Sequence, residues 1–321
     1  MKTFATLCAS ALWALCMPAS AQNAWDETTP ALDLVDYRPE RWLLEDELFF
    51  FLDAGEALFE AKFTSQDGAG RPNSTQAAIP HRPRKPLAQA FSRTSGPDAS
   101  ACSSCHNDPV SGGAGDYVTN VFTASGFANA VFDTNDPEFS NERGTNHLFG
   151  AGLVELLARE MTVELQSHRH QALITARETQ QPVTAALTAK GISFGTLTAF
   201  PDATVDPSMI EGVDFDLIIK PFTHKGVIRS LRNFTLNAMN HHSGMQAEER
   251  FGPRWTGTSD FDEDGFTAEM SQGEISALVA WQATLPPPVR RDDLSPDWAA
   301  AAQDGEGLFT DFGCATCHVS A

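Results

Sequence analysis

Cysteine is scarce, with only six in this chain of 321 residues. Two of the six cysteines, Cys8 and Cys16, lie in an apolar N-terminal stretch that has the features of an export signal. The other four are confined to two short stretches, 102–106 and 314–318. Exported proteins usually pair their cysteines in disulfides, but here no cysteine is left for a separate structural bridge. A scaffold held by disulfides is therefore not expected.

Basic residues are also few, with 22 Lys and Arg against 42 Asp and Glu and a formal net charge of −20. This charge disfavours nucleic acid and anionic membrane surfaces as partners and suits a basic redox partner better. After the N-terminus no stretch is apolar enough to cross a bilayer, so no membrane span is expected. The length allows two modest domains.

The N-terminus predicts a signal peptide over residues 1–21. Lys2 provides the positive charge, residues 4–16 form a short apolar core, and the small residues Ala19-Ser20-Ala21 provide a cleavage site. A lipoprotein anchor at Cys16 is disfavoured because bulky Leu15 precedes that cysteine. We expect cleavage near Ala21 and a periplasmic or secreted protein.

The two cysteine-containing stretches, "CSSCH" and "CATCH", share the pattern Cys-x-x-Cys-His. This pattern is the attachment signal of a c-type haem, in which the thiols bond to the haem and the histidine binds its iron. Zinc and a redox dithiol are alternatives, but neither explains a histidine directly after the second cysteine in both motifs. The predicted attachment residues are Cys102, Cys105, Cys314 and Cys317, with His106 and His318 as proximal iron ligands.

Candidates for the distal iron ligand gather in the stretch "NAMNHHSGMQAEERFG", residues 237–252. His242 is preferred, followed by His241 and Met245. A second His or Met ligand opposite the proximal histidine gives an electron-transfer haem, whereas an open position permits chemistry. The alternative is that these side chains are ordinary surface or core residues.

A further acidic stretch, "DFDEDG" at 260–265, places Asp260, Asp262 and Asp264 like the first half of a calcium loop. The glutamate that closes such a loop would fall at position 271, where the chain has serine. An acidic surface turn is therefore favoured over a calcium site.

Hydrophobic periodicity predicts a mainly α protein with a small β element. Helices are expected over 41–63, 148–190, 226–251 and 272–285, and strand-like runs over 192–222. "GEALF" at 55–59 and "GEGLF" at 305–309 form a weak internal repeat, one before each haem motif. We predict a cytochrome c-like first haem domain with inserted loops over 22–285, a linker over 286–298, and the start of a second cytochrome c-like domain over 299–321.

Five stretches together resemble the di-haem oxidoreductase family of peroxidases and thiol oxidoreductases, which is related to bacterial di-haem cytochrome c peroxidases and to MauG. They are "AGEALFEAKFTSQDGAG", the first haem motif, "NHLFGAGLVELL", "GVIRSLRNFTLNAMNHHSGMQ" and "DGEGLFTDFGCATCHV". Family members look longer after the second motif, so the resemblance implies that this chain is C-terminally truncated.

The resemblance implies a peroxidase-type oxidoreductase with two haems. One haem would take electrons from a small periplasmic donor such as a cytochrome c or cupredoxin, and the other would reduce peroxide or another small oxidant. Glu248, Glu249 and His241 are candidate proton-transfer groups, and Trp281 or Trp255 is a candidate electron relay. The alternatives are a non-catalytic electron-transfer cytochrome c and a haem oxygenase-type oxidation of an organic substrate.

Overall fold

The computed structural model describes residues 45–64, 67–69, 91–92, 101–115, 118–124, 140–223, 226–261, 265–316 and 318. These residues are mainly helical, which confirms the predicted class, and the strands form small sheets. The helices are α1 (Glu45–Glu60), α2 (Ala151–Thr179), α3 (Leu231–Ala238), α4 (Glu248–Phe251), α5 (Pro253–Thr256), α6 (Gln272–Thr284) and α7 (Pro296–Asp311). The strands are β1 (Phe91–Ser92), β2 (Val118–Ala124), β3 (Ser140–Gly144), β4 (Val183–Ala189), β5 (Ile192–Ala199) and β6 (Val205–Asp206). The predicted signal peptide lies outside the described residues.

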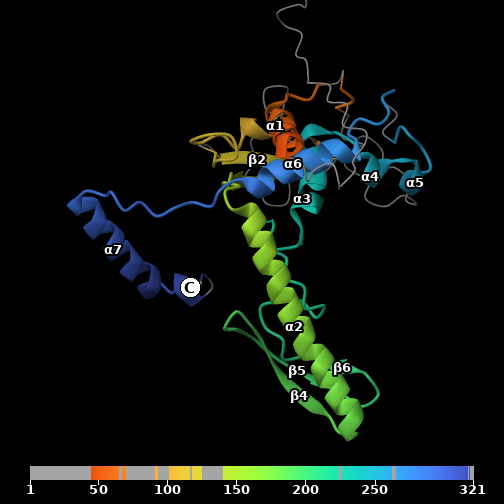
Figure 1. The fold of residues 1–321 in the computed structure, drawn as a ribbon, viewed down its shortest axis with the longest axis vertical. Coiled ribbons are helices and arrows are strands. Elements are labelled where there is room, and N and C mark those ends of the chain that lie inside the picture. Colours follow the sequence, from red (N-terminus) through yellow and green to blue (C-terminus); the bar gives the residue numbers. More distant parts are fainter. Residues whose placement is uncertain are drawn as a thin grey trace, which may run out of the picture.

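Helices α1 and α6 cross at the centre of the main body (Figure 1). Gly55 makes the crossing close, because a Cβ at this position would lie 2.2 Å from the carbonyl oxygen of Ala277. Helix α6 begins at a capping box, in which Ser271 and Glu274 each bond the other's backbone N–H. The core around the crossing is formed by Phe51, Ala54, Leu58, Phe59, Ala61, Phe63, Leu236, Met239, Met245, Ala247, Met270, Ile275, Ala277, Leu278 and Trp281.

Helix α2 starts against the body and extends away from it as an arm (Figure 1). Its first turn approaches the end of α6 at Gly152, where a Cβ would lie 2.2 Å from the carbonyl oxygen of Ala283. The antiparallel β4–β5 hairpin packs along α2, and β6 extends the sheet. A second apolar core between the helix and the hairpin, which includes Leu165, Leu187 and Leu197, makes the arm a separately packed unit.

The arm corrects two sequence predictions. The helix expected over 148–190 ends at Thr179, and residues 183–189 form a strand instead. Pro182 explains the end, because proline lacks the N–H that a helix needs and disfavours helical backbone at the residue before it. The strand-like run over 192–222 is a strand only at 192–199 and 205–206.

Strands β1, β2 and β3 form a second antiparallel sheet in the order β1-β2-β3. Helix α7 stands apart from the rest of the described chain, after the segment that follows α6 (Figure 1), and none of its residues is buried. Among the described residues, no helix combines the length and the apolar character needed to cross a membrane.

Candidate haem attachment sites

The first Cys-x-x-Cys-His motif forms a single 3₁₀ turn, Cys102–Ser104. The backbone N–H of His106 closes the turn by donating to the carbonyl of Cys102 at 3.0 Å. The backbone N–H of Gly112 then donates to the carbonyl of His106 at 3.0 Å. The motif therefore holds its histidine through backbone contacts on both sides.

Glycines allow the next loop to fold back tightly behind the motif. The backbones of Asp108 and Ala114 exchange two hydrogen bonds of 2.8 Å. A Cβ at Gly113 would lie 2.1 Å from the carbonyl oxygen of Asp108, and one at Gly115 would lie 2.7 Å from that of Cys105. These positions cannot take a larger residue without moving the loop.

An aromatic side chain from α1 lies beside His106. The ring centroids of Phe59 and His106 are 6.2 Å apart. The ring centroids of Phe59 and Trp281, which lies in α6, are 4.5 Å apart. Cys102 packs against the same core. The first motif therefore packs against the crossing of α1 and α6, and Phe59 lies between His106 and Trp281 in this chain of contacts.

Burial shifts the pKa of two groups in the first motif. It lowers the pKa of His106, and this effect outweighs the backbone carbonyls of Asn146 and Gly113, which raise it. Burial also raises the pKa of the Cys102 thiol to about 12. Nδ1 of His106 is buried with no hydrogen-bond partner among the described residues. A neutral imidazole is the form that can bind a metal ion.

The second motif repeats the local structure of the first. Cys314–Thr316 form a 3₁₀ turn, and the backbone N–H of His318 donates to the carbonyl of Cys314 at 2.9 Å. Phe309 of α7 lies 6.0 Å from His318 between ring centroids. Cys102, Cys105 and Cys314 are free thiols, while Cys317 lies outside the described residues.

The predicted distal stretch lies at the end of α3, which continues as a π-helix over Met239–Ser243 and ends at Gly244 with φ of 73°. Met245 is buried in the core that contains Phe59 and Trp281. His242 is half-buried, and the side chain of His241 lies outside the described residues. The structure thus brings Met245 into the core on which the first motif is seated.

The two glutamates proposed for proton transfer have different surroundings. Glu249 forms an ion pair with Arg232, which also donates to Ser276 Oγ at 2.9 Å. This pair joins α3, α4 and α6. Glu248 is exposed and lines a pocket. Of the two, Glu249 serves to hold the helices together.

The remaining candidates also differ in their positions. Trp281 is buried in the core, whereas Trp255 is about half exposed, at 48%, with Arg254 over its ring.

Of the three candidate calcium ligands, only Asp260 lies within the described residues. Its Oδ2 accepts from the N–H of Gly265 at 3.1 Å, and Asp262 and Asp264 lie outside the described residues. Within the described ranges, no cluster of three or more His, Cys, Asp or Glu could hold a metal ion.

Sequence reasoning missed three features of the structure around the candidate residues. Arg232 was not identified as a partner of Glu249, and nothing in the spacing of the two residues signals that pairing. The role of Phe59 beside His106 was signalled only by the "GEALF" repeat. The glycines at 112, 113 and 115 carried a turn signal but no indication of the backbone approach that they permit.

No protein-family model, no curated protein and no solved structure matches this chain.

Proposed function

We propose that this chain is an exported di-haem c-type oxidoreductase of peroxidase type. The observation that carries the proposal is a structural module present twice. It consists of a helix with Gly-x-x-Leu-Phe in its last two turns, a 3₁₀ turn that begins at the first Cys, and the Phe ring near the ring of the motif histidine. The centroid distances are 6.2 Å for Phe59 and His106 and 6.0 Å for Phe309 and His318. A repeated local structure is not expected for two motifs that arose by chance.

The residues of the first motif fit a covalently attached haem. Cys102 and Cys105 are free thiols on one turn, and burial favours the neutral form of His106. The crossing of α1 and α6 beside the motif supports a cytochrome c-like arrangement. Cys102 and Cys105 would form the thioethers and His106 would bind the iron, as Cys314, Cys317 and His318 would in the second module.

Bound haem would supply the one-electron chemistry, and the chain would control access and orientation. The buried aromatic pair of Phe59 and Trp281 excludes water from one side of His106. Glu248 is the exposed carboxylate of the 237–252 stretch and is the better placed of the two glutamates to exchange a proton with solvent. A small periplasmic cytochrome c or cupredoxin is the proposed donor, and peroxide or another small oxidant the acceptor.

One observation favours a second candidate, a non-catalytic electron-transfer cytochrome. Met245 is only 1% exposed and shares a core with Phe59, the residue that packs on His106. A methionine thioether opposite a proximal histidine produces a low-spin electron-transfer haem.

The first experiment is a pyridine haemochrome assay on the full chain matured in a periplasm with a c-type haem attachment system. We expect two haems per chain in the wild type and one in each of the variants Cys105→Ser and Cys317→Ser. Soluble, exported protein without haem would refute the proposal. Peroxide-dependent oxidation of a reduced cytochrome c then separates the two functions, because a purely electron-transfer protein would show none.

A further inference from the structure

Arg250, on the short helix α4, carries a positive charge that forms no ion pair with the described residues. Its side chain is half-buried, and the central carbon of its guanidinium lies 5.1 Å from the ring centroid of Phe251. Within the described part of the chain, the side chain makes one hydrogen bond, a long one of 3.5 Å from Nη1 to Oδ1 of Asn237. Because a guanidinium has five N–H donors, most of its hydrogen-bonding capacity is unused there.

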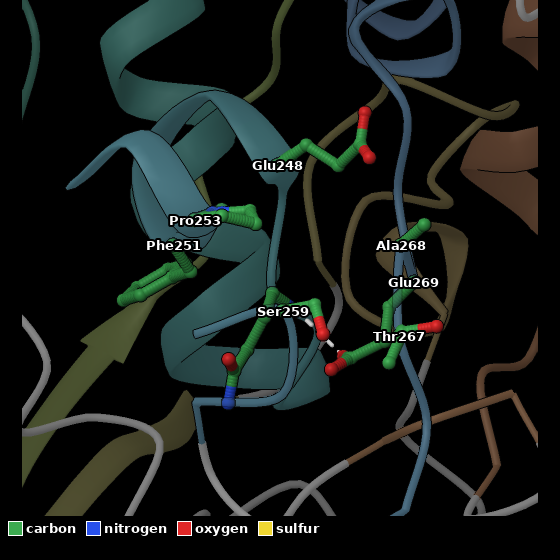
Figure 2. Close-up of a pocket in the computed structure, with 9 residues that line it drawn as sticks. Glu248, Phe251, Pro253, Ser259, Thr267, Ala268 and Glu269 are labelled. Carbon is green, nitrogen blue, oxygen red and sulfur yellow. Dashed lines mark hydrogen bonds between the residues drawn. The ribbon is translucent and has the colours of Figure 1, made fainter. Parts of the chain in front are cut away.

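The carboxylates that are closest to Arg250 in sequence do not pair with it. Glu249 forms its ion pair with Arg232 of α3 instead. The side chain of Glu248 leaves α4 in a different direction from that of Phe251, the ring on which Arg250 packs (Figure 2). The neighbouring arginine is thus neutralised, while Arg250 is not.

The direction of the pKa shift of Arg250 agrees with this geometry. Burial lowers the pKa of Arg250, whereas a carboxylate in contact with the guanidinium would raise that pKa. An arginine stays protonated at neutral pH even so, because its ordinary pKa lies far above neutrality. A partly desolvated cation without a counterion is costly, so an anion that reaches it gains free energy.

The surroundings of Arg250 favour a carboxylate over a phosphate as that anion. A guanidinium with one face on an aromatic ring leaves its edge for a ligand, and its planar fork matches the two oxygens of a carboxylate. The chain has a formal net charge of −20, and this field opposes a dianion about twice as strongly as a monoanion. The shape and the charge of the site therefore select the same ligand group.

We propose that Arg250 and Asn237 form a binding site for one carboxylate group. The guanidinium of Arg250 pairs with the two carboxylate oxygens, and Oδ1 of Asn237 holds the guanidinium in position for them. A free small carboxylate and a propionate of a haem attached at the first motif are the two sources of such a group. The second source rests on the proposed function, and it is considered because Met239 and Met245, which lie between Asn237 and Arg250 in sequence, share a core with Phe59.

Titration of the full exported chain with isotope-labelled acetate, followed by NMR at constant ionic strength, tests the free source. We expect one saturable site in the wild type and at least about tenfold weaker binding in Arg250→Gln, because a charge-assisted hydrogen bond contributes roughly that factor. Acetamide, which has a similar shape but no charge, should not bind. The matched control is Arg254→Gln, since Arg254 also lies over an aromatic ring but is exposed, and it should leave acetate binding unchanged.

The same variants test the haem propionate as the source. If a propionate occupies the site, the wild type binds no acetate. Arg250→Gln should then lower the reduction potential of one haem, because a nearby positive charge stabilises the reduced form, and should shift the propionate band in the resonance Raman spectrum. Arg254→Gln should change neither.

Arg250→Gln breaks no ion pair among the described residues, so we expect it to fold. Asn237→Ala is a second variant, which should weaken acetate binding about fivefold or shift the same propionate band. The proposal is overturned if the wild type binds no acetate and Arg250→Gln leaves the haem potentials and the propionate band unchanged. It is also overturned if Arg250→Gln and Arg254→Gln weaken acetate equally. If the exported chain contains no haem, the proposed function fails, and acetate binding alone decides for or against this site.

Discussion

The two Cys-x-x-Cys-His motifs share a local structure but differ in what surrounds it. Leu58 and Phe59 in the first module are each 1% exposed, while their counterparts Leu308 and Phe309 are 49% and 41% exposed. The glycine that begins each Gly-x-x-Leu-Phe repeat shows why the exposed fractions of these side chains differ. Gly55 lies against the backbone of α6, whereas a Cβ at Gly305 would meet nothing within 4 Å among the described atoms. The same five-residue pattern therefore serves as a helix contact in one place and leaves an open face in the other.

The largest contrast is expected from the paired variants Gly55→Ala and Gly305→Ala. The added methyl at position 55 collides with α6, so the helices must separate, at a cost of about 3 kcal/mol in the free energy of unfolding. At position 305 the same change should stabilise α7 by about 0.5–1 kcal/mol, because alanine is the better helix former. Urea unfolding followed by circular dichroism measures both, and equal effects would disprove the proposed difference in packing.

The paired variants Leu58→Ala and Leu308→Ala test the same contrast through side-chain burial. Truncation of the fully buried Leu58 should cost about 2–5 kcal/mol through lost contacts and a residual cavity. Leu308 is about half exposed, at 49%, so its truncation should stay within about 0.5 kcal/mol. If thermal unfolding shows a large loss for Leu308→Ala, then α7 is covered in solution.

The cysteines should differ in reactivity in haem-free precursor made in the cytoplasm. Burial raises the pKa of Cys102 to about 12, and only the thiolate reacts with iodoacetamide. Labelling of Cys102 should therefore be slow at pH 8 and accelerate as pH rises toward 12, whereas exposed Cys314 should label faster at pH 8. Mass spectrometry of the tryptic peptides gives both rates, and faster labelling of Cys102 would contradict the described burial.

The smallest effect is expected from removing the second module. A chain ended at Leu285 should unfold within about 0.5 kcal/mol of the full chain, because α7 buries none of its residues. If each motif carries one haem as proposed, the haem content by the pyridine haemochrome assay should fall from two to one. A marked loss of stability would show that the two modules pack together.

The sequence predicted helices best where local signals agreed. The helix expected over 272–285 is observed as Gln272–Thr284, between the Ser271 cap and the prolines at 286–288. Prediction failed where a tertiary partner decided the outcome. Residues 183–189 contain the Leu and Ala of a helix, yet they pair with β5 and cover α2. Pro182 is a local signal for the break, but only the pairing with β5 and the contact with α2 made the following residues a strand.

In the candidate site, too, local features were predictable from the sequence and long-range contacts were not. The spacing of Cys102, Cys105 and His106 alone predicted the attachment residues, and the 3₁₀ turn follows from local backbone bonds. The ion pair of Glu249 with Arg232 and the packing of Met245 in one core with Phe59 bring together residues that are distant in sequence. Periodicity cannot assign such partners, because it records which face of an element is apolar and not what lies against it.

By itself the sequence determined the chemistry available to this protein and its local shapes. Thiol and imidazole groups occupy two Cys-x-x-Cys-His motifs, a helix precedes each motif, and prolines end α2 and α6. Only the tertiary structure decided which of the two modules is enclosed. Burial needs a second surface, and α6 supplies one to Gly55 and Phe59 while no described element supplies one to Gly305 and Phe309. Local backbone energetics made the modules alike, and long-range packing made them different.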